Sequence, residues 1–380
     1  KEIGAIINRR KFSLAAGASA LAGFPAVHAQ SEKIIIGQSA AFSGPAAQLG
    51  IHLHAGAKLF FDQLNAQGGI GGRPVEIRKL DDAYEPARCE ENTRKLLEED
   101  VSALFAYVGT PTSAVALPLA TKAKVPFIAP FTGAMALRNP FNRYAFHVRA
   151  SYNDETALIV NQLRNVGLTK VAVMYQNDAY GKAGLDGVQL ALAKHNLKPV
   201  AIATVERNSV DVAKAVETIN AASPEAVVQI SAYTSCAAYI RAARKAGYGG
   251  GFYNVSFVGT QALADELGKF GAGVVVSQVV PSPYSAGKAI SREFADAVRR
   301  SNGAVQSNYS SMEGYIAAKV LAEGLRRSGG KGGADGLMTA LESINNMSMG
   351  GFNVNFSKAD HVASTFVEMS MLTGDGKVRV

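Results

Sequence analysis

The sequence is poor in cysteine and in long apolar runs. Only Cys89 and Cys236 occur among the 380 residues, and they lie far apart in the chain. We expect two separate thiols, because the pattern described below places them in different domains, out of reach of a disulfide. After the first 29 residues, no stretch approaches the roughly 20 consecutive apolar residues that a membrane helix needs. No membrane-spanning helix is therefore predicted in the mature chain.

Short catalytic and metal-binding motifs are also missing. The chain after residue 29 has no GxSxG, GxxxxGK[ST], HExxH or CxxC pattern, and its glycine clusters follow helical segments, where helix C-caps explain them. His52 and His54 are two positions apart, so on a helix they point to different faces and form a poor metal pair. The remaining internal histidines, His147, His195 and His361, are isolated. We predict no metal, no cofactor and no enzymatic activity.

Clustered positive charge is absent as well, although the formal net charge is +8. The basic residues are scattered, and no stripe of Lys and Arg interleaved with aromatic residues appears, so nucleic acid is not an expected partner. Part of the charge lies in residues 1–29, which have a basic start, a short apolar middle and a small-residue end at Val27-His28-Ala29. This pattern predicts an export signal cleaved after about Ala29. Arg9-Arg10 is similar to a twin-arginine signal with Asn8 at an unusual position, so the export route, Sec or twin-arginine, stays open.

What the chain does have is a repeated alternation of short apolar runs and amphipathic segments. The runs "KIIIGQ", "VEIRKL", "VSALFAYV" and "VPFIAP" alternate with helical patterns up to about residue 150, and the same rhythm restarts at "KVAVMYQ". Such alternation predicts parallel sheets covered by helices on both faces. The predicted fold is α/β, with two similar doubly wound lobes joined by a hinge of three chain crossings. The predicted boundaries are 1–29 for the signal, 30–149 plus about 281–355 for lobe 1, and 150–280 plus about 356–380 for lobe 2.

The expected binding site lies where the strands end. Ligands of open parallel sheets bind beyond the carboxyl ends of the strands, where helix N-termini also point. In "YVGTPTSAV" we expect Thr110 to be the N-cap of a helix whose free amides, including that of Ser113, would hold a carboxylate. The next strand ends at Phe131, Thr132 and Gly133, and the second series ends near Tyr180 and Tyr233. These rings are expected to clamp an apolar body while the hydroxyls hold a polar head.

Five segments resemble, in order and spacing, the leucine/isoleucine/valine-binding family of periplasmic substrate-binding proteins of ABC transporters. They are "IIIGQSAAFSGPAAQLG", "DQLNAQGGIGGRPVEIRKLDDAYEP", "GTPTS", "QNDAYG" and "QVVPSPY". The resemblance implies the type I periplasmic-binding-protein fold, two lobes closing over one ligand, a periplasmic location and a membrane permease as partner. Position by position, it implies a ligand-binding set that consists of Leu49, Thr110, Phe131, Thr132, Gly133, Tyr180, Tyr233 and Ser256.

Ser256 departs from the family pattern. The resemblance implies an acidic residue here that holds the ammonium group of an amino acid, whereas serine has no charge. A desolvated ammonium group without an anionic partner costs several kcal/mol. The ligand is therefore expected to bear a carboxylate and to be either an amino acid or an aromatic or organic acid without an ammonium group. Glu313, Asp178 or another acid remain alternatives for supplying the charge.

The sequence thus predicts a solute receptor of an ABC importer that captures its ligand by closure of the two lobes. Two alternatives remain open. One is a sensory receptor module of the same fold, and the other is a periplasmic enzyme.

Overall fold

The computed structural model describes residues 32–329 and 333–380; the predicted export signal lies outside these residues. The elements of the first series are β1 (Ile34–Ala40), α1 (Ala47–Ala66), β2 (Val75–Asp81), α2 (Pro86–Glu98), β3 (Ala103–Phe105), α3 (Thr110–Ala123), β4 (Phe127–Ile128), the 3-10 helix η1 (Met135–Leu137) and β5 (Ala145–Phe146). Their strands form one sheet in the order β2-β1-β3-β4-β5, and every pairing in it is parallel. The first predicted lobe therefore contains a parallel sheet, as expected.

The second series forms its own sheet. Its elements are α4 (Tyr152–Asn165), β6 (Val171–Gln176), α5 (Ala179–Ala193), β7 (Ala201–Val205), α6 (Ala213–Ala221), β8 (Ala226–Ile230), α7 (Tyr233–Lys245), β9 (Gly251–Asn254), η2 (Ser256–Val258), α8 (Thr260–Leu267), η3 (Gly268–Gly271) and β10 (Val275–Gln278). The strand order is β14-β13-β10-β9-β8-β6-β7. The last two strands of the chain, β13 (Glu368–Leu372) and β14 (Val378–Arg379), join its edge in antiparallel pairings, an addition to the parallel sheet that the repeat pattern did not predict.

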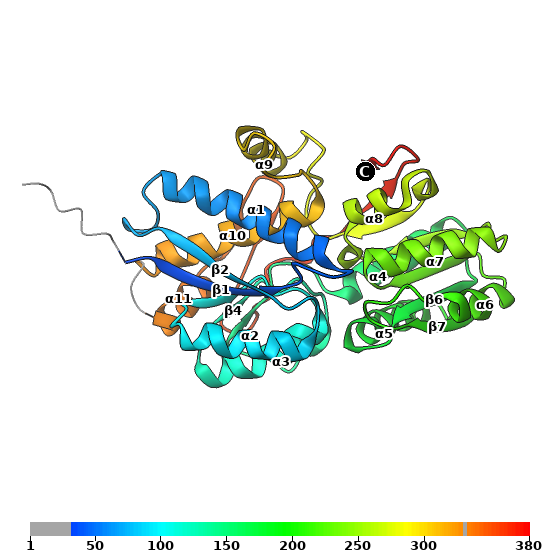
Figure 1. Cartoon of the computed structure of the whole chain (residues 1–380), viewed down its shortest axis with the longest axis horizontal. Helices are drawn as coiled ribbons and strands as arrows, with labels where there is room; N and C mark the ends of the chain where they lie inside the picture. The colour runs from blue at the N-terminus through cyan, green and yellow to red at the C-terminus, as the bar shows by residue number, and fades with distance from the viewer. Residues whose placement is uncertain (1–31, 330–332) are drawn as a thin grey trace, which may run out of the picture. The chain divides into compact units, whose positions relative to one another are not determined.

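The chain between β10 and β13 is mainly helical. It contains α9 (Ala289–Arg300), α10 (Tyr309–Arg327), α11 (Gly333–Glu342) and a small antiparallel pair, β11 (Met347–Ser348) with β12 (Asn353–Val354). Helix α10 packs along α1, and Figure 1 shows both on the same face of the first sheet, with α2 and α3 on the other face.

Two glycines allow α10 to approach α1 closely. A Cβ atom at Gly56 would clash with the carbonyl group of Ser311, and one at Gly314 would clash with the carbonyl group of Leu53. Only glycine permits this distance between the helix backbones. The helices of residues 289–342 thus return to the first sheet, while the lobe boundaries themselves stay a prediction.

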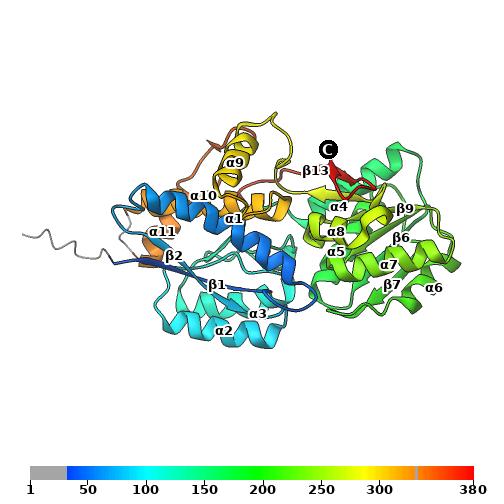
Figure 2. The ribbon, with the colours of Figure 1, turned by 45° about the horizontal axis from the view of Figure 1, so that its top comes forward.

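Around the second sheet, α4 packs beside α5, and α7 packs between α6 and α8. Figure 2 shows these helices around β6, β7 and β9. Alternating strand and helix segments place apolar side chains on both faces of each sheet, and Val173, Val228 and Ile230 in the second sheet are fully buried. The fold predicted from the alternation, two doubly wound α/β units, is confirmed.

Two chain segments that run between the sheets lie side by side. The amide of His147 donates to the carbonyl of His361 (2.8 Å), and the amide of Ala363 donates to the carbonyl of His147 (2.8 Å). This parallel bridge joins the segment that leaves β5 to the segment that leads into β13. The first and third of the three predicted crossings are therefore in backbone contact.

Candidate ligand-binding site

The first half of the site is built where β3 and β4 end. Beyond the strands proper, the Phe131 amide donates to Tyr107 (2.7 Å) and the Gly109 amide donates to Phe131 (3.2 Å), which extends the parallel pairing by a few residues. The two chains then diverge at Thr110 and Thr132, whose hydroxyl oxygens lie 2.6 Å apart and share a hydrogen bond. Both threonines are buried. The strand ends thus bring together the two hydroxyls that the sequence analysis selected.

The start of α3 differs by one residue from the prediction. Gly109, not Thr110, is the N-cap, with φ at +102°, and a Cβ atom there would clash with the Tyr84 ring. Glycine tolerates both constraints, so the chain turns one residue earlier than predicted. The Ser113 amide was expected to be free, but it donates to the Gly109 carbonyl (3.1 Å). That expectation was wrong, because the amide belongs to the first hydrogen-bonded turn of the helix.

The second half of the site comes from the strand ends of the second sheet. Tyr180 follows β6 at the start of α5, where Asp178 is the N-cap and accepts from the Tyr180 amide (2.9 Å). The other Asp178 oxygen pairs with Arg207 (3.4 Å), so this acid, one of the alternatives for an ammonium partner, is already used. The Tyr180 side chain is fully buried, and its hydroxyl has no hydrogen-bond partner among residues 32–329 and 333–380.

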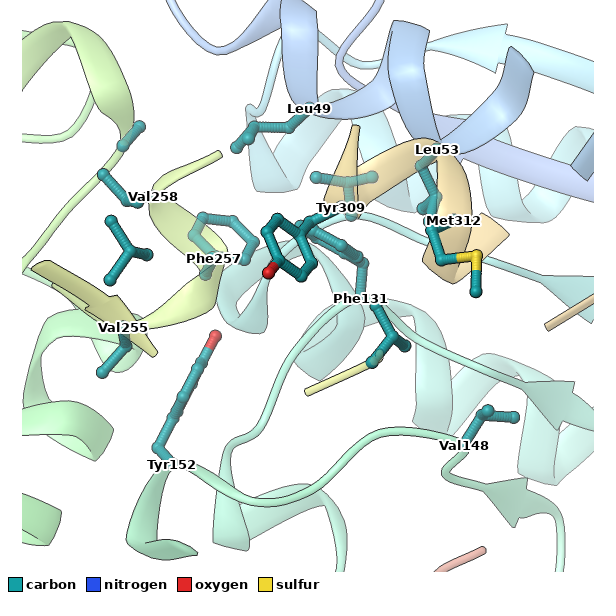
Figure 3. Packing of buried hydrophobic residues seen from close by; sticks show 14 of the residues in the cluster. Leu49, Leu53, Phe131, Val148, Tyr152, Val255, Phe257, Val258, Tyr309 and Met312 are labelled. Carbon is teal, nitrogen blue, oxygen red and sulfur yellow. The ribbon is translucent and has the colours of Figure 1, made fainter. Parts of the chain in front are cut away.

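Five rings from both halves form what we call the aromatic cluster. Phe257 is at its centre, with ring centroids 4.5 Å from Tyr180, 5.5 Å from Phe131 and 5.8 Å from Tyr84. Tyr152, at the start of α4, lies 5.4 Å from Tyr180. In Figure 3 the Tyr152 ring points from α4 toward Phe257. The cluster therefore joins Tyr84 and Phe131, which follow strands of the first sheet, to aromatic residues of the second series.

Leu49 lies beside Gly259 and Phe257, and Tyr233 contacts the residue before Leu49. The hydroxyl of Tyr233, the first residue of α7, accepts from the Gln48 amide (3.4 Å) next to buried Leu49. Leu49 also approaches Gly259 so closely that a Cβ atom there would clash with it, and Figure 3 shows it above Phe257. The carbonyl of Gly133 accepts from the Tyr152 amide (2.8 Å), so Gly133 lies beside the first residue of α4.

Ser256 belongs to a group of buried polar residues that we call the charged cluster, which consists of Arg149, Glu155, Ser256, Ser277 and Glu313. Glu155 accepts from the Ser256 amide (2.7 Å), the Ser256 hydroxyl (3.1 Å) and the Ser277 hydroxyl (2.6 Å). Arg149 donates to the Ser256 hydroxyl. Its guanidinium group also lies 3.5 Å from Glu155 and 3.6 Å from Glu313. A carboxylate thus stands beside Ser256, but an arginine of the protein already pairs with it.

Burial dominates the electrostatics of the charged cluster. It raises the pKa of Glu155, against the opposing effects of Arg149 and the two serines. Burial also raises the pKa of Glu313 to about 7, with Arg149 acting in the opposite direction. For Arg149 itself, burial disfavours the charged form, but Glu313 and Glu155 outweigh it and raise the pKa. The arginine therefore stays charged, whereas Glu313 takes up a proton near neutral pH.

Six residues of the two clusters were missed from the sequence: Arg149, Tyr152, Glu155, Phe257, Tyr84 and Ser277. The first three lie in "RASYNDET", which marks the restart of the repeat but gives no strand-end signal. Its helix signal was present, since Ser151 and Asp154 form a capping box at the start of α4. Phe257 lies in "NVSFVG", where β9 stops at Asn254 and a 3-10 turn aims the ring inward; the strand-end rule could have identified it.

A second set of contacts links the chain around Tyr84 to the segment that follows β7 and to β6. Asn208 donates to Glu85 (2.7 Å) and to the Ala83 carbonyl (3.2 Å). Arg207 pairs with Glu85 (3.3 Å). Gln176 donates to the Tyr84 hydroxyl (3.2 Å). The side chains of Arg207 and Glu85 are partly exposed, at 24% and 44%. This ion pair of the second set is therefore more exposed to solvent than the aromatic cluster.

The described part of the chain offers no group of three or more His, Cys, Asp and Glu side chains positioned to hold a metal ion. Both cysteines are buried and free, as expected. Among the described helices, none combines the length and the apolar character that crossing a bilayer requires.

Comparisons with known proteins agree with this geometry. The family model for periplasmic binding proteins matches residues 33–377. The chain belongs to the periplasmic binding protein family. A crystal structure of a possible leucine/isoleucine/valine-binding protein from Rhodopirellula baltica SH 1 is 33% identical, with a TM-score of 0.87 over 93% of this chain and 97% of that one.

Two further proteins show the same relationship. A substrate-binding periplasmic protein from Ralstonia solanacearum is 29% identical, with a TM-score of 0.86, covering 91% of this chain and 99% of that one. Leu/Ile/Val-binding protein homolog 7 from Brucella abortus is 23% identical and covers 78% of each chain. These relatives are binding proteins. The periplasmic binding protein described here is thus a ligand-binding receptor, and the enzyme alternative is not supported.

Proposed function

We propose that this periplasmic binding protein is the solute receptor of an ABC importer and captures a small carboxylate-bearing molecule between its two lobes. The observation that carries the proposal is the aromatic cluster, in which strand ends of both sheets contribute rings around Phe257. A ligand that lies between the lobes contacts both of them only when the lobes are closed. Binding then shifts the population toward the closed form, which the permease would recognise.

The proposed ligand-binding set is that of the sequence analysis, extended by Phe257 and Arg149. It consists of Leu49, Thr110, Phe131, Thr132, Gly133, Tyr180, Tyr233 and Ser256, with the two added residues. Rings from both lobes would enclose the apolar part of the ligand, and the buried hydroxyls and the guanidinium group would hold its polar part.

The proposed lobes retain the predicted boundaries, about residues 30–149 plus 281–355 and about residues 150–280 plus 356–380. The return of α10 to α1 and the antiparallel attachment of β13 to β10 support this division. We also keep a periplasmic location and signal cleavage after about Ala29 as proposals, supported by the family to which the chain belongs. The sensory module alternative is distinguished by the partner, since a transport receptor stimulates the ATPase activity of its permease complex.

Two measurements test the proposed function. Mass spectrometry of small molecules released by unfolding the purified protein should identify a carboxylic acid. The protein refolded without ligand should then bind that acid in calorimetric titration and contract in small-angle X-ray scattering when it does. A ligand that binds without contraction, or a copurifying ligand without a carboxylate, contradicts the proposal.

A further inference from the structure

The hydrogen-bond acceptors of Glu155 are fully used within the protein. One carboxylate oxygen accepts from the Ser256 amide (2.7 Å) and the Ser277 hydroxyl (2.6 Å). The other accepts from the Ser256 hydroxyl (3.1 Å) and from Arg149 (3.5 Å). A carboxylate offers about four acceptor sites, so Glu155 has none left for an ammonium group of a ligand.

Arg149, in contrast, has hydrogen-bonding capacity left. Only 1% of its side chain is exposed, and the Nη1 nitrogen has no partner in the described part of the chain. Its guanidinium carbon lies 4.7 Å from the centre of the Phe131 ring, so the group borders the aromatic cluster. A charged donor that is buried without a partner is costly. A ligand that supplies an acceptor at this point would remove that cost.

A second unused donor belongs to the same region. The Tyr180 hydroxyl is buried without a partner among the described residues, and it lies on the ring that packs 4.5 Å from Phe257. Arg149 lies over the Phe131 ring, Tyr180 packs against Phe257, and the Phe131 and Phe257 ring centroids are 5.5 Å apart. Asp178 is occupied as a helix cap and by Arg207. Within the described part of the chain, the groups without a partner at the cluster are thus the guanidinium nitrogen of Arg149 and the hydroxyls of Tyr180 and Tyr152. All of them can donate to an anion, and the guanidinium group is the charged one among them.

Glu313 is the one acid of the charged cluster with acceptors to spare. Arg149 is the partner of Glu313, at 3.6 Å. The negative charge of Glu155 favours the protonated form of Glu313. With Glu313 protonated, the charges of Arg149 and Glu155 cancel. The carboxylate of a ligand can then pair with the free Nη1 edge of Arg149. An ammonium group of a ligand could pair with Glu313 only if Glu313 lost its proton in a buried site.

From these contacts we propose that the ligand is a monocarboxylic acid without an α-ammonium group, whose carboxylate binds the Nη1 edge of Arg149 and the Tyr180 hydroxyl while its apolar body packs in the aromatic cluster. The guanidinium group of Arg149 takes the place that the ligand's ammonium group would fill. This inference rests on the proposed function and narrows its ligand class.

The test compares matched acids on the wild-type protein, refolded without ligand, by calorimetry at pH 7. The pairs are 3-phenylpropanoate with phenylalanine and 4-methylpentanoate with leucine, which differ in the α-ammonium group. We expect the acid without nitrogen to bind at least about tenfold more tightly in one or both pairs, because the ammonium group of the amino acid gains an anionic partner only if Glu313 loses its proton in a buried site. Tighter binding of the amino acids would overturn the inference and leave the proposed function standing. Binding of neither member of either pair would overturn both.

A double variant tests the assigned residue. Arg149→Met alone would leave Glu155 unpaired, so the matched variant is Arg149→Met with Glu155→Gln, which keeps the cluster neutral. With its fold verified by circular dichroism, it should lose at least about thirtyfold in affinity for the preferred acid, since one buried charged contact is removed. Unchanged affinity in a folded variant contradicts the role of Arg149. Should the variant fail to fold, Tyr180→Phe, which removes the second donor, provides the same comparison, and unchanged affinity there counts against the proposal.

Discussion

The Thr110–Thr132 pair beyond the first sheet and the Tyr180 hydroxyl beyond the second differ in their hydrogen-bond partners. On the first-sheet side, Thr110 and Thr132 share a hydrogen bond of 2.6 Å, and Thr112 donates to the carbonyls of Val108 and Gly109. On the second-sheet side, the Tyr180 hydroxyl is buried and has no partner among the described residues. A ligand that binds the threonines must replace an existing hydrogen bond, whereas one that binds Tyr180 gains a bond without losing another. Side chains that would both be named ligand-binding residues therefore differ in what they contribute to affinity and to stability.

The buried acids differ in the same way. Glu155 accepts hydrogen bonds at both oxygens, whereas Glu313 has, among the described residues, one ion-pair contact at 3.6 Å. The first is part of the folded framework, and the second is a titratable group held in place by the packing of α10. Four experiments separate framework residues from residues with unused capacity.

The largest effect is expected for Glu155→Ala. The substitution leaves Arg149 and the amide of Ser256 without their main partner in a buried site, so unfolding should become easier by about 3–5 kcal/mol. Urea unfolding followed by circular dichroism measures the loss. Glu293→Ala is the control, because Glu293 pairs with Lys319 while both side chains are partly exposed and should cost less than about 1 kcal/mol. Equal losses in the two variants would show that Glu155 is not a buried anchor.

Glu313 should give the next largest effect, visible as a pH dependence. Its pKa rises from 4.5 in the unfolded chain to about 7 in the folded protein, so between these values the folded state holds the proton more tightly. Protonated Glu313 therefore makes its full contribution to the free energy of unfolding below about pH 4.5, and this contribution falls as the pH rises toward 7. Above pH 7 the free energy of unfolding is lower by up to roughly 3 kcal/mol.

Thermal unfolding from pH 4.5 to 8 should therefore show a steeper decline in Tm for the wild type than for Glu313→Gln. Arg149, Glu155 and Arg138 are the charged groups that act on Glu313. Glu155, with its raised pKa, and Asp82, with a pKa of about 6, contribute slopes of the same sign to both proteins. The difference between the two curves isolates Glu313, and parallel curves would contradict the shift.

Thr110→Ala should act mainly on stability. It leaves the buried Thr132 hydroxyl without the partner at 2.6 Å, which costs about 1–3 kcal/mol. The affinity for the ligand should fall by less than this, since the lost bond to the ligand is offset by the lost bond in the free protein. Denaturant unfolding and calorimetry on the same preparation give both values. A large loss of affinity with unchanged stability would place the polar head of the ligand on Thr110 instead.

Tyr180→Phe should show the smallest effect on stability. In contrast to Thr110→Ala, it should act mainly on ligand affinity. Removing a buried hydroxyl without a partner should leave Tm unchanged or raise it, while ligand affinity falls by about 0.5–1.5 kcal/mol. Tyr239→Phe is the matched control, because the Tyr239 hydroxyl is also buried and unpartnered in the described structure but lies on α7 beside Phe252. It should leave affinity unchanged. Equal affinities for Tyr180→Phe and wild type would remove Tyr180 from the site.

The sequence predicted the parts of the molecule that follow from local periodicity. Alternating apolar runs identified the strands of both parallel sheets. Apolar residues at three- and four-residue steps between Leu49 and Leu64 predict a helix over residues 46–67, and α1 spans Ala47–Ala66. The rule that ligands bind beyond the carboxyl ends of parallel strands selected Thr110, Thr132 and Tyr180, and all three follow strand ends in the structure. These features depend on patterns of a few residues, which a single sequence contains.

What the sequence did not reveal depends on contacts between distant segments. The helix α4 was missed, and with it Tyr152 and Glu155, because "RASYNDET" was interpreted only as a break between the repeats. The partnership of Glu155 with Ser256, about a hundred positions away, has no local signature. The same holds for Arg149, whose environment is formed by both series. Residues that lie between the two sheets are therefore the ones that single-sequence reasoning loses.

The paired backbone at His147 and Ala363 has a mechanical consequence. Two strands of chain that are hydrogen-bonded to one another can bend together, but sliding one along the other breaks both bonds. We therefore expect relative motion of the two sheets to be a rotation near this bridge and not a translation along it. The two short backbone hydrogen bonds thus lie only two residues from Arg149, so the proposed pivot and the proposed ligand-binding set share one segment of chain.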